Sequence, residues 1–399
     1  MISVNKFFRA IIIMFSIFTA GTLMANDLLK DAVQVAQKVK IANGEVVTCD
    51  PSLFDSIITI PLSFFCDNLE VVKLESSEEA KVVPSPAMIS NNYILVETAA
   101  KYPFKLFDRK TGAFITNIGE LGSGPNQYRG VYYSQIDEKN DRIYILSILS
   151  TQIVVFNLKG EPQPAIPLRY ASPKGVFNVN FAEKKVAVVI LPFEEEQAMA
   201  WEQTFTGKLL KSIPPGHLSI PAEFEYDINT SSNVVDEFDF FVLPRKPKND
   251  TLYHYNTIEN KFVPQFTFDF KDGDLSSYYF SQTKDYYIGR IVMPKKEGDD
   301  PHKEPDSRFF IIDKATLKGS YFSVVNDYLG DMKIEWPVYD FSRGYYTFNI
   351  APKELRDKLE EILNENTEMS AEMREKMETL KNSITGKDNS YIFYGKLKK

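Results

Sequence analysis

The sequence is poor in the residues that most often build disulfides and metal sites, because its 399 residues include two cysteines and three histidines. Cys49 and Cys66 can form a disulfide in an oxidising compartment, or they can be two buried free thiols. The sequence leaves both possibilities open. His217, His254 and His302 lie far apart in the chain. No metal site is therefore predicted, since a structural zinc site needs four clustered ligands.

The chain also lacks the motifs of nucleophilic catalysis and of phosphate binding. It contains no Gly-x-Ser-x-Gly motif, and its few histidines assemble no catalytic triad. The segment Gly122-Ser123-Gly124-Pro125 is rich in glycine but lacks the third glycine and the Lys-Ser/Thr pair of a phosphate loop. The catalytic residues, if there are any, stay unknown at this stage.

Positive charge is in deficit, with 46 Lys and Arg against 54 Asp and Glu and a net charge of −8. Removal of a leader containing Lys6 and Arg9 would make the balance 44 − 54 = −10. An acidic chain without a basic stripe repels the phosphate backbone, so nucleic acid is excluded as the expected partner. The same charge gives little attraction to anionic membranes.

The first 25 residues have the composition of a secretory signal peptide. Lys6 and Arg9 form the positive region, Ala10–Phe18 is apolar, and Thr22–Ala25 offers a cleavage site before Asn26. The alternative is a retained membrane anchor, for which the apolar stretch is short. No cysteine lies near the cleavage site, which argues against a lipoprotein. The sequence predicts a periplasmic or secreted protein with no stable membrane span after cleavage.

Aromatic residues are abundant, at 13% of the chain, and they recur at a fixed spacing. Five β-rich runs end in a bulky residue followed by a small polar one: Phe107-Asp108, Phe156-Asn157, Phe205-Thr206, Tyr255-Asn256 and Ile312-Asp313. The polar members are 49, 49, 50 and 57 positions apart. Such a period, with several strands in each repeat, predicts an all-β propeller. We attribute the long last step to an exposed loop over 294–306.

A sixth blade is expected from the strands 344–350 and 391–398, separated by a helical insertion over about 352–381. Its outer strand is missing at the C-terminal end of the chain, so Leu69–Leu74 is predicted to pair with Tyr391–Leu397 and close the ring. The predicted domains are a signal peptide over 1–25, an N-terminal segment over 26–62 and a six-bladed propeller over 63–399. Within the N-terminal segment, apolar spacing predicts an amphipathic helix over Asp27–Lys40.

One stretch is more specific: the hairpin sequence around Phe107-Asp108 and Thr111-Gly112, followed by the segment Gly122-Ser123-Gly124-Pro125-Asn126-Gln127-Tyr128. With the run 68–75 and Asp388-Asn389-Ser390, it resembles a large family of secreted six-bladed β-propellers abundant in Bacteroidetes. The resemblance implies a ring of the general shape of NHL and TolB-type propellers and implies no settled activity. Ser390 stands where that family is expected to have proline, and the family's lipobox cysteine is missing.

Two groups of residues are candidate sites. Asn126, Gln127, Tyr128 and Arg129 would be ligand contacts if their loop lies at the channel mouth; otherwise the loop is a connection between blades, with Tyr128 packed at the junction. The acidic clusters 223–227 and 236–239 could support acid–base chemistry or calcium binding. Alternation of acids with aromatics is equally typical of a half-buried strand with a wet outer face, which is the interpretation we favour.

These observations predict a non-catalytic binding or scaffold propeller, monomeric and without a cofactor. It would recognise a peptide, glycan or protein partner at the channel face. The alternative is a metal-assisted propeller enzyme of the lactonase, lyase or hydrolase type, for which calcium is a possible cofactor. Fold alone does not separate the two, because function depends on the site.

Overall fold

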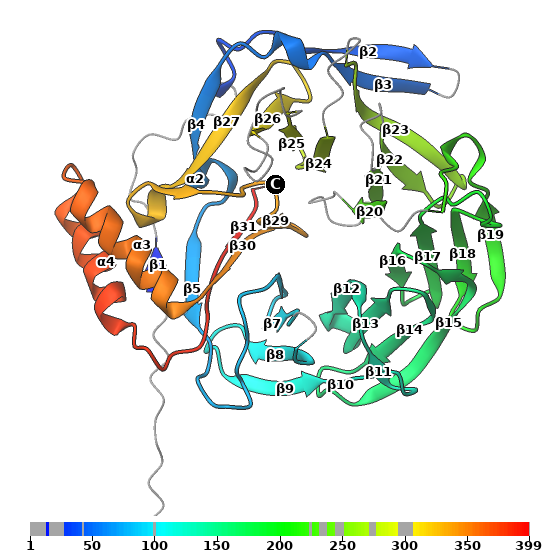
Figure 1. Ribbon diagram of the computed structural model, residues 1–399, viewed down its shortest axis with the longest axis horizontal. Coiled ribbons are helices and arrows are strands. Elements are labelled where there is room, and N and C mark those ends of the chain that lie inside the picture. The colour runs from blue at the N-terminus through cyan, green and yellow to red at the C-terminus, as the bar shows by residue number, and fades with distance from the viewer. Residues whose placement is uncertain are drawn as a thin grey trace, which may run out of the picture.

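The computed structural model is a six-bladed β-propeller, as the sequence predicts, with its blades arranged around a central channel (Figure 1). It describes residues 13–15, 28–41, 44–98, 101–222, 226–230, 238–243, 251–270, 277–293 and 306–398. The predicted signal peptide lies outside these residues except for the strand β1 (Ile13–Phe15), which pairs with β5 (Leu69–Lys73). The loop expected over 294–306 also lies outside them, apart from Asp306.

Each blade is an antiparallel sheet of four strands that run in order from the channel to the rim. Blade 1 consists of β6 (Ala87–Ile89), β7 (Tyr93–Val96), β8 (Phe104–Asp108) and β9 (Phe114–Ile118). Blade 2 consists of β12 (Val131–Asp137), β13 (Arg142–Ser147), β14 (Ser150–Phe156) and β15 (Pro162–Ser172). Blade 3 consists of β16 (Gly175–Asn180), β17 (Lys185–Ile190), β18 (Ala200–Thr204) and β19 (Leu209–Ile213). Blade 4 consists of β20 (Asp227–Thr230), β21 (Asp239–Leu243), β22 (Thr251–Asn256) and β23 (Lys261–Phe268). Blade 5 consists of β24 (Ser277–Gln282), β25 (Tyr286–Val292), β26 (Ser307–Asp313) and β27 (Gly319–Asn326). Blade 6 consists of β29 (Phe341–Ser342), β30 (Tyr345–Ile350), β31 (Tyr391–Lys396) and β5. Short elements complete the fold: β10 (Glu120–Leu121), β11 (Gln127–Tyr128), β28 (Met332–Ile334), α2 (Leu62–Phe65), η1 (Pro51–Leu53), η2 (Glu138–Asn140), η3 (Gly216–Leu218) and η4 (Asp327–Leu329).

The hydrophobic core lies between the blades. Each buried cluster of the described residues combines side chains from two neighbouring blades, so both faces of every sheet are covered. Between blades 2 and 3, for example, Tyr144 and Ile153 pack with Phe177 and Trp201. Removal of this apolar surface from water is the main force that holds adjacent blades together.

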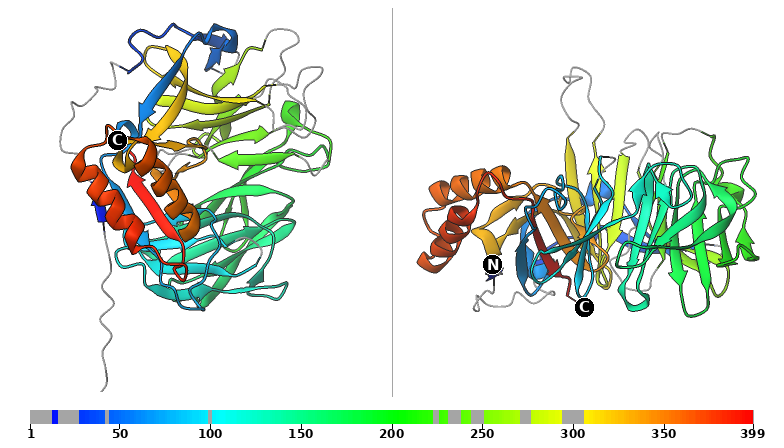
Figure 2. Two further views of the ribbon diagram at one scale, coloured as in Figure 1. Left: turned by 60° about the vertical axis from the view of Figure 1, so that its left-hand side comes forward. Right: turned by 90° about the horizontal axis from the view of Figure 1, so that it is seen from below.

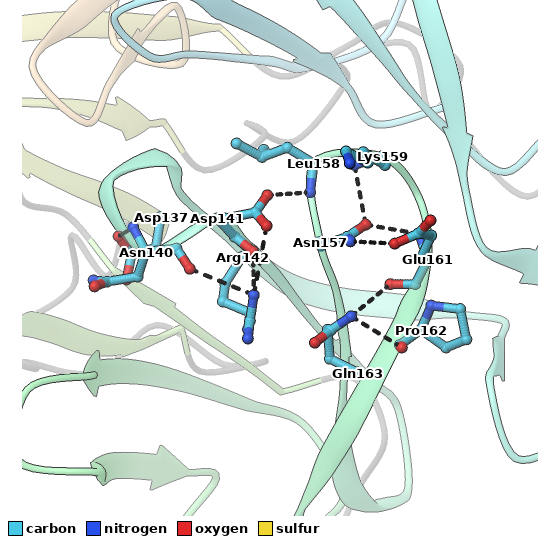
Figure 3. A network of polar contacts seen from close by, with 10 residues as sticks. All are labelled: Asp137, Asn140, Asp141, Arg142, Asn157, Leu158, Lys159, Glu161, Pro162 and Gln163. Carbon is cyan, nitrogen blue, oxygen red and sulfur yellow. Dashed lines mark hydrogen bonds and ion pairs between the residues drawn. The ribbon is translucent and has the colours of Figure 1, made fainter.

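The repeated bulky–polar pair has a structural cause: it ends the third strand of a blade, and the polar side chain closes the hairpin to the fourth. Asn157 in blade 2 accepts hydrogen bonds from the backbone N–H groups of Lys159 and Glu161 at 3.0 and 2.9 Å (Figure 3). Asp108 and Asp313 do the same in blades 1 and 5. Asn256 in blade 4 accepts from Glu259 N at 2.9 Å, whereas in blade 3 the acceptor is Thr204 and not Thr206. These side-chain hydrogen bonds stabilise the sharp chain reversal, which explains why a polar residue recurs at this point.

The ring closes as predicted, through antiparallel pairing of β5 with β31 in the register from Tyr391↔Lys73 to Tyr394↔Glu70. Glu70 also links the closing strand to blade 1, because its carboxylate accepts hydrogen bonds from Tyr394 Oη at 2.7 Å and Arg109 Nη2 at 3.3 Å. The Arg109 guanidinium lies 4.7 Å from the centre of the Tyr394 ring. Blade 6 is therefore completed by residues from both ends of the sequence.

Asn389 fixes the connection between β5 and blade 1. Its buried amide donates to the carbonyl groups of Glu75 and Ala80 at 2.8 and 2.7 Å, and its oxygen accepts from the N–H of Val82 at 3.2 Å. Gly112 lies against the same region, where an added Cβ would come within 2.1 Å of the Lys73 carbonyl oxygen. The residues that carry the family resemblance at 112 and 389 thus serve ring closure.

The N-terminal segment differs from the prediction. The helix expected over Asp27–Lys40 is wrong, because β2 (Ala36–Ile41) and β3 (Gly44–Cys49) form a hairpin there. β3 pairs in parallel with the rim strand β23, and β4 (Ile57–Pro61) pairs in parallel with β27. The segment therefore extends blades 4 and 5 at the rim of the ring. Pairing with an open sheet edge outweighs the helical spacing of these residues.

The helical insertion is confirmed between β30 and β31, but it consists of two helices, α3 (Pro352–Glu365) and α4 (Ala371–Ser383), on one side of the ring (Figure 2). Ser370 starts the second helix, because its hydroxyl accepts a hydrogen bond from the N–H of Met373 at 3.2 Å. The buried Leu355, Leu359 and Leu380 join the core of blades 5 and 6. Of the helices described, none is long and apolar enough to cross a membrane.

The two cysteines are free and buried, the second of the two possibilities that the sequence left open. Cys49 packs in the core between blades 4 and 5, and Cys66 packs in the core beside blade 6. Burial raises the pKa of Cys66 to about 12 and also raises that of Cys49. Both groups therefore stay in the unreactive thiol form at neutral pH.

We expect a variant that lacks residues 1–74 to lose its cooperative thermal transition, because the rim edge of β31 is then unpaired and blade 6 is open to blade 1. The control lacks residues 1–25 only, and it should melt cooperatively. Circular dichroism at increasing temperature distinguishes the two. An unchanged transition in the longer truncation would show that β5 is not required for closure.

The Asn389→Ala variant should lose about 2–4 kcal/mol of unfolding free energy, because three buried backbone groups lose their hydrogen-bond partner. Urea denaturation measures this loss. Asn126→Ala, at an exposed position in the connection between blades 1 and 2, is the matched control and should change stability by less than about 0.5 kcal/mol. Equal stabilities of the two variants would contradict the role given to Asn389.

Candidate functional site

A cavity of about 480 Å³ lies at the centre of the ring, where the inner strands converge. Inner strands of five blades contribute to its wall: β6, β12, β20, β24 and β29. The wall combines aromatic rings, hydroxyl and amide groups, and a few charges; the polar and aromatic members include Glu97, Tyr132, Tyr133, Ser134, Thr230, Tyr279, Ser281, Tyr339, Asp340, Phe341, Arg343, Phe348 and Asn349. This mixture is typical of ligand sites, in which apolar surface gives affinity and placed polar groups give orientation.

One side of the cavity contains a connected charge pair. Glu97, just after β7, accepts a hydrogen bond from the hydroxyl of Ser134 in β12. Arg343 donates to the Ser134 carbonyl oxygen, and its guanidinium lies 4.9 Å from the centre of the Tyr133 ring. Burial raises the pKa of Glu97, while the Ser134 hydrogen bond and the Arg343 charge lower it in part. Arg343 has a left-handed backbone, with a φ of 51°, in the tight turn between β29 and β30.

Asp340 is the other carboxyl group of the cavity, and its surroundings are different. It lies just before β29, where its backbone carbonyl accepts a hydrogen bond from Thr347 N at 2.8 Å. Among the described residues, its carboxyl group has neither a hydrogen bond nor an ion pair. Burial raises the pKa of Asp340 to about 8, because a buried carboxylate without a partner loses its hydration. This carboxyl group is therefore largely protonated at neutral pH.

Aromatic rings lie beside Asp340. Tyr339 is 44% exposed, and its ring centre lies 4.6 Å from that of Tyr279 in β24, with 38° between the planes. Trp336 is also exposed and lies 6.1 Å from Tyr339. The Arg290 guanidinium covers Trp336 at 4.6 Å. The rim of the cavity therefore presents aromatic faces next to an unpaired carboxyl group.

The four ligand contacts proposed from sequence do not line this cavity. They belong to the connection between β9 and β12, where β10 and β11 form a short parallel pair. Tyr128 is buried at the junction of blades 1 and 2, and its hydroxyl donates to Ile118 O at 2.6 Å and accepts from Phe104 N at 2.7 Å. Gln127 bonds within the loop, to Gly124 N and Glu120, while Asn126 and Arg129 are exposed. Tyr128 and Gln127 thus hold the connection in place.

The acidic clusters are only partly described, since 223–225 and 236–237 lie outside the described residues. Asp227 pairs with Lys174 at 2.7 Å. The expected wet face is wrong for Asp239, which is 2% exposed and bonds to His254 Nδ1 at 2.9 Å and to Gln282 Nε2 at 2.6 Å. Its partners come from β22 and from β24 of the next blade, so the sequence around Asp239 does not reveal them.

A metal-assisted enzyme requires side chains that can bind a metal ion. Within the part of the chain that the structure describes, no group of three or more His, Cys, Asp and Glu side chains is placed to hold a metal ion. A second and larger cavity, of about 720 Å³, lies beside blades 2 and 3. Its carboxylates have partners: Lys185 contacts Glu183 at 2.6 Å and Glu202 at 3.5 Å, and Asp137 accepts from Asn140 Nδ2 at 2.7 Å. The central cavity is the stronger candidate site because it retains an unpaired carboxyl group.

Sequence reasoning missed Glu97, Asp340 and Arg343. Glu97 and Arg343 lie on opposite sides of the ring closure and are brought together only when blade 6 meets blade 1 and blade 2. The one local signal is the turn Arg343-Gly344 between two aromatic strands. The strand predicted from residue 344 is preceded by β29, which begins at Phe341. An inner strand of two residues is too short for a recognisable alternation.

The stability of the protein should fall as pH rises from about 4 to about 8, because the folded chain keeps a proton on Asp340 that the unfolded chain has released. Asp340→Asn removes this contribution, so its stability relative to wild type should increase with pH. The gain should reach a few kcal/mol near pH 9, at about 1.4 kcal/mol per unit of pKa shift. Denaturant melts at several pH values measure it. Parallel pH profiles of the two proteins would contradict the assignment.

Comparisons with known proteins agree with the fold. The sequence profile of a family described as "Domain of unknown function (DUF4934)" matches residues 45–396, and no functionally curated protein matches the chain. The crystal structure of a protein from Bacteroides fragilis NCTC 9343 matches 86% of this chain and 100% of its own chain, at 14% identity and a TM-score of 0.55. The name of that protein contains the word exported. A DUF4221 family member from Bacteroides vulgatus ATCC 8482 covers 92% of this chain and 98% of its own, at 12% identity and a TM-score of 0.40.

At these identities the first structure supports the propeller fold alone, and the expected relation to NHL and TolB-type propellers stays a prediction. The family profile is more direct evidence, because it extends from the N-terminal hairpin to the last strand of blade 6. This chain therefore belongs to the family described as Domain of unknown function (DUF4934).

Proposed function

We propose that this protein is a non-catalytic binding or scaffold propeller that holds a peptide, glycan or protein partner in its central cavity. The observation that carries the proposal is the composition of the cavity wall, where tyrosine rings, hydroxyl groups and an amide from five blades surround one space. Tyrosine offers both an apolar face and a hydrogen-bonding end, so it is well suited to reversible recognition of polar ligands.

We further propose that the protein is exported by cleavage of its first 25 residues and acts in the periplasm or outside the cell, as a monomer. The charged and apolar pattern of 1–25 supports export. The fold shared with a protein that is named as exported is consistent with it. The net charge after cleavage, 44 − 54 = −10, favours solubility and disfavours nucleic-acid partners.

The alternative of a metal-assisted enzyme has less support. A divalent cation such as calcium prefers several carboxylate and carbonyl oxygens at one point. The described cavity wall contains two carboxyl groups, of which Glu97 is already bonded to Ser134 and faces Arg343. Asp239 is also engaged, by His254 and Gln282. The available geometry thus favours binding without a cofactor.

The Ser342→Trp variant tests the proposal, because this small, half-buried residue lines the cavity and an indole there would fill part of it. Peptide and glycan arrays should identify a ligand of the wild-type protein whose affinity falls tenfold or more, about 1.4 kcal/mol, in the variant. Ser123→Trp, in an exposed connection away from the cavity, is the matched control and should bind as wild type does.

Both variants should melt near the wild-type temperature, which separates loss of the site from loss of the fold. A ligand that binds Ser342→Trp as tightly as wild type would place binding elsewhere on the ring. Absence of any ligand for the wild-type protein in both arrays would contradict a peptide or glycan receptor.

A further inference from the structure

The charged residues of the central cavity differ in whether their side chains have bonded partners. Three formally charged residues line it: Glu97, Asp340 and Arg343. Arg343 is already engaged, by the Ser134 carbonyl oxygen, the Tyr133 ring and the charge of Glu97. A ligand anion would therefore have to compete with existing contacts for Arg343, the single cation in the described part of the wall. Asp340, in contrast, has no bonded partner among the described residues for its carboxyl group.

The position of Asp340 makes this unpaired state informative. Asp340 is half-buried, and a carboxyl group that is partly withdrawn from water is normally paired or hydrogen-bonded, since loss of hydration disfavours its charged form. Asp340 instead faces an open cavity large enough for a ligand group. A cation bound there would supply the missing partner and make a charge-assisted hydrogen bond, which is stronger than a neutral one.

Aromatic rings beside Asp340 favour the same kind of ligand. The faces of tyrosine and tryptophan rings attract cations through their quadrupole. Tyr339 is adjacent to Asp340 in sequence, is 44% exposed, and packs against Tyr279 with ring centres 4.6 Å apart and a tilt of 38°. Trp336, whose ring centre lies 6.1 Å from that of Tyr339, already makes a cation–π contact with the Arg290 guanidinium at 4.6 Å.

We propose that the central cavity binds a cationic group, an ammonium or a guanidinium, with Asp340 as its counter-charge and Tyr339 and Tyr279 beside it. The inference rests on the binding function proposed above and specifies the chemistry of the ligand. The cation can belong to a lysine or arginine side chain of a peptide or to an amino sugar. These two sources share the recognised group and are separated by the probes below.

Cation binding has a consequence for protons. The pKa of Asp340 is raised by burial to about 8, and a cation beside it reverses that effect, so the carboxyl group releases its proton when the ligand binds below pH 8. The other titratable groups of the described wall are Glu97, Arg343, Tyr132, Tyr133, Tyr279 and Tyr339, and the buried Tyr346 also interacts with the charge of Asp340. Glu97 also has a raised pKa, so the proton must be assigned with a variant of Asp340 alone.

The experiment is isothermal titration calorimetry of the full chain with two matched pairs of probes. The first pair is the blocked peptide acetyl-Gly-Lys-Gly-amide and its form acetylated on the lysine amine. The second pair is glucosamine and N-acetylglucosamine. Within the pair that matches the natural source, the charged probe should bind roughly ten- to hundredfold more tightly than the neutral one, the range expected for a hydrogen bond to a charged group.

Asp340→Asn should reduce this preference to less than about threefold, because the amide keeps the shape and removes the charge. Tyr339→Leu should weaken the charged probe by roughly two- to fivefold, because the apolar bulk remains but the aromatic face is lost. Asp357→Asn is the matched control, since Asp357 is an exposed carboxylate on α3 that pairs with Lys353 at 3.3 Å, and it should bind as wild type does.

Titrations at about pH 6.5 in phosphate and in MES buffer report the proton, because the two buffers differ in ionisation enthalpy and both buffer at this pH. Wild type should release up to about one proton for each charged probe bound, and Asp340→Asn should release none. A structural role for Asp340 alone would not produce this difference.

Equal affinity for charged and neutral probes, or a charge preference that survives in Asp340→Asn, overturns the inference. So does failure of both charged probes to bind wild type while a ligand from the arrays binds and is lost in Ser342→Trp. In that last case the binding function of the cavity stands and only its ligand class is wrong. If no ligand is sensitive to Ser342→Trp, the function proposed for the cavity fails as well.

Discussion

The structure depends on one interaction, the antiparallel pairing of β5 with β31. A propeller blade buries both faces against its neighbours, so a ring that fails to close exposes two large apolar surfaces and a row of unpaired backbone groups. Here the two ends of the sequence share blade 6. Glu70, Arg109 and Tyr394 join that blade to blade 1 through hydrogen bonds and a cation–π contact. The Asn389 amide donates hydrogen bonds to the backbone that connects β5 to blade 1. Closure is therefore secured by specific polar contacts in addition to sheet pairing.

Closure also creates the candidate site. The cavity wall takes residues from inner strands of blades 1, 2, 4, 5 and 6, and the contact between Arg343 and Ser134 joins blade 6 to blade 2. These side chains hold their relative positions because the cores between the blades fix the strands that carry them. A site made by a closed ring is pre-organised, which reduces the entropy lost when a ligand binds. The N-terminal strands β3 and β4 reinforce blades 4 and 5 from the rim.

The sequence predicted the parts of this fold that are governed by local chemistry. The polar residue after each third strand recurs because Asp108, Asn157 and Asp313 all close the same hairpin turn with a side-chain hydrogen bond. The sequence failed where distant partners decide. Residues 36–41 have helical spacing yet form a strand, since β3 and the rim of blade 4 offer an open edge. Asp239 belongs to an acidic cluster, but His254 and Gln282 make it a buried hydrogen-bonding centre. The cavity residues have no common motif, because only the ring brings them together.

The contrast between Glu97 and Asp340 is the most informative feature of the cavity. Both are acidic residues at the ends of connections, and both are half-buried in the same wall. Glu97 is compensated by Ser134 and Arg343, so its burial needs no external partner. Asp340 has no such compensation in the described structure, and its pKa of about 8 reflects the resulting destabilisation of its charged form. If Asp340 served only the fold, an asparagine would fill the same space without the cost of a buried acid. A carboxyl group without a partner in the wall of a cavity is characteristic of binding sites, where a ligand supplies the missing interaction.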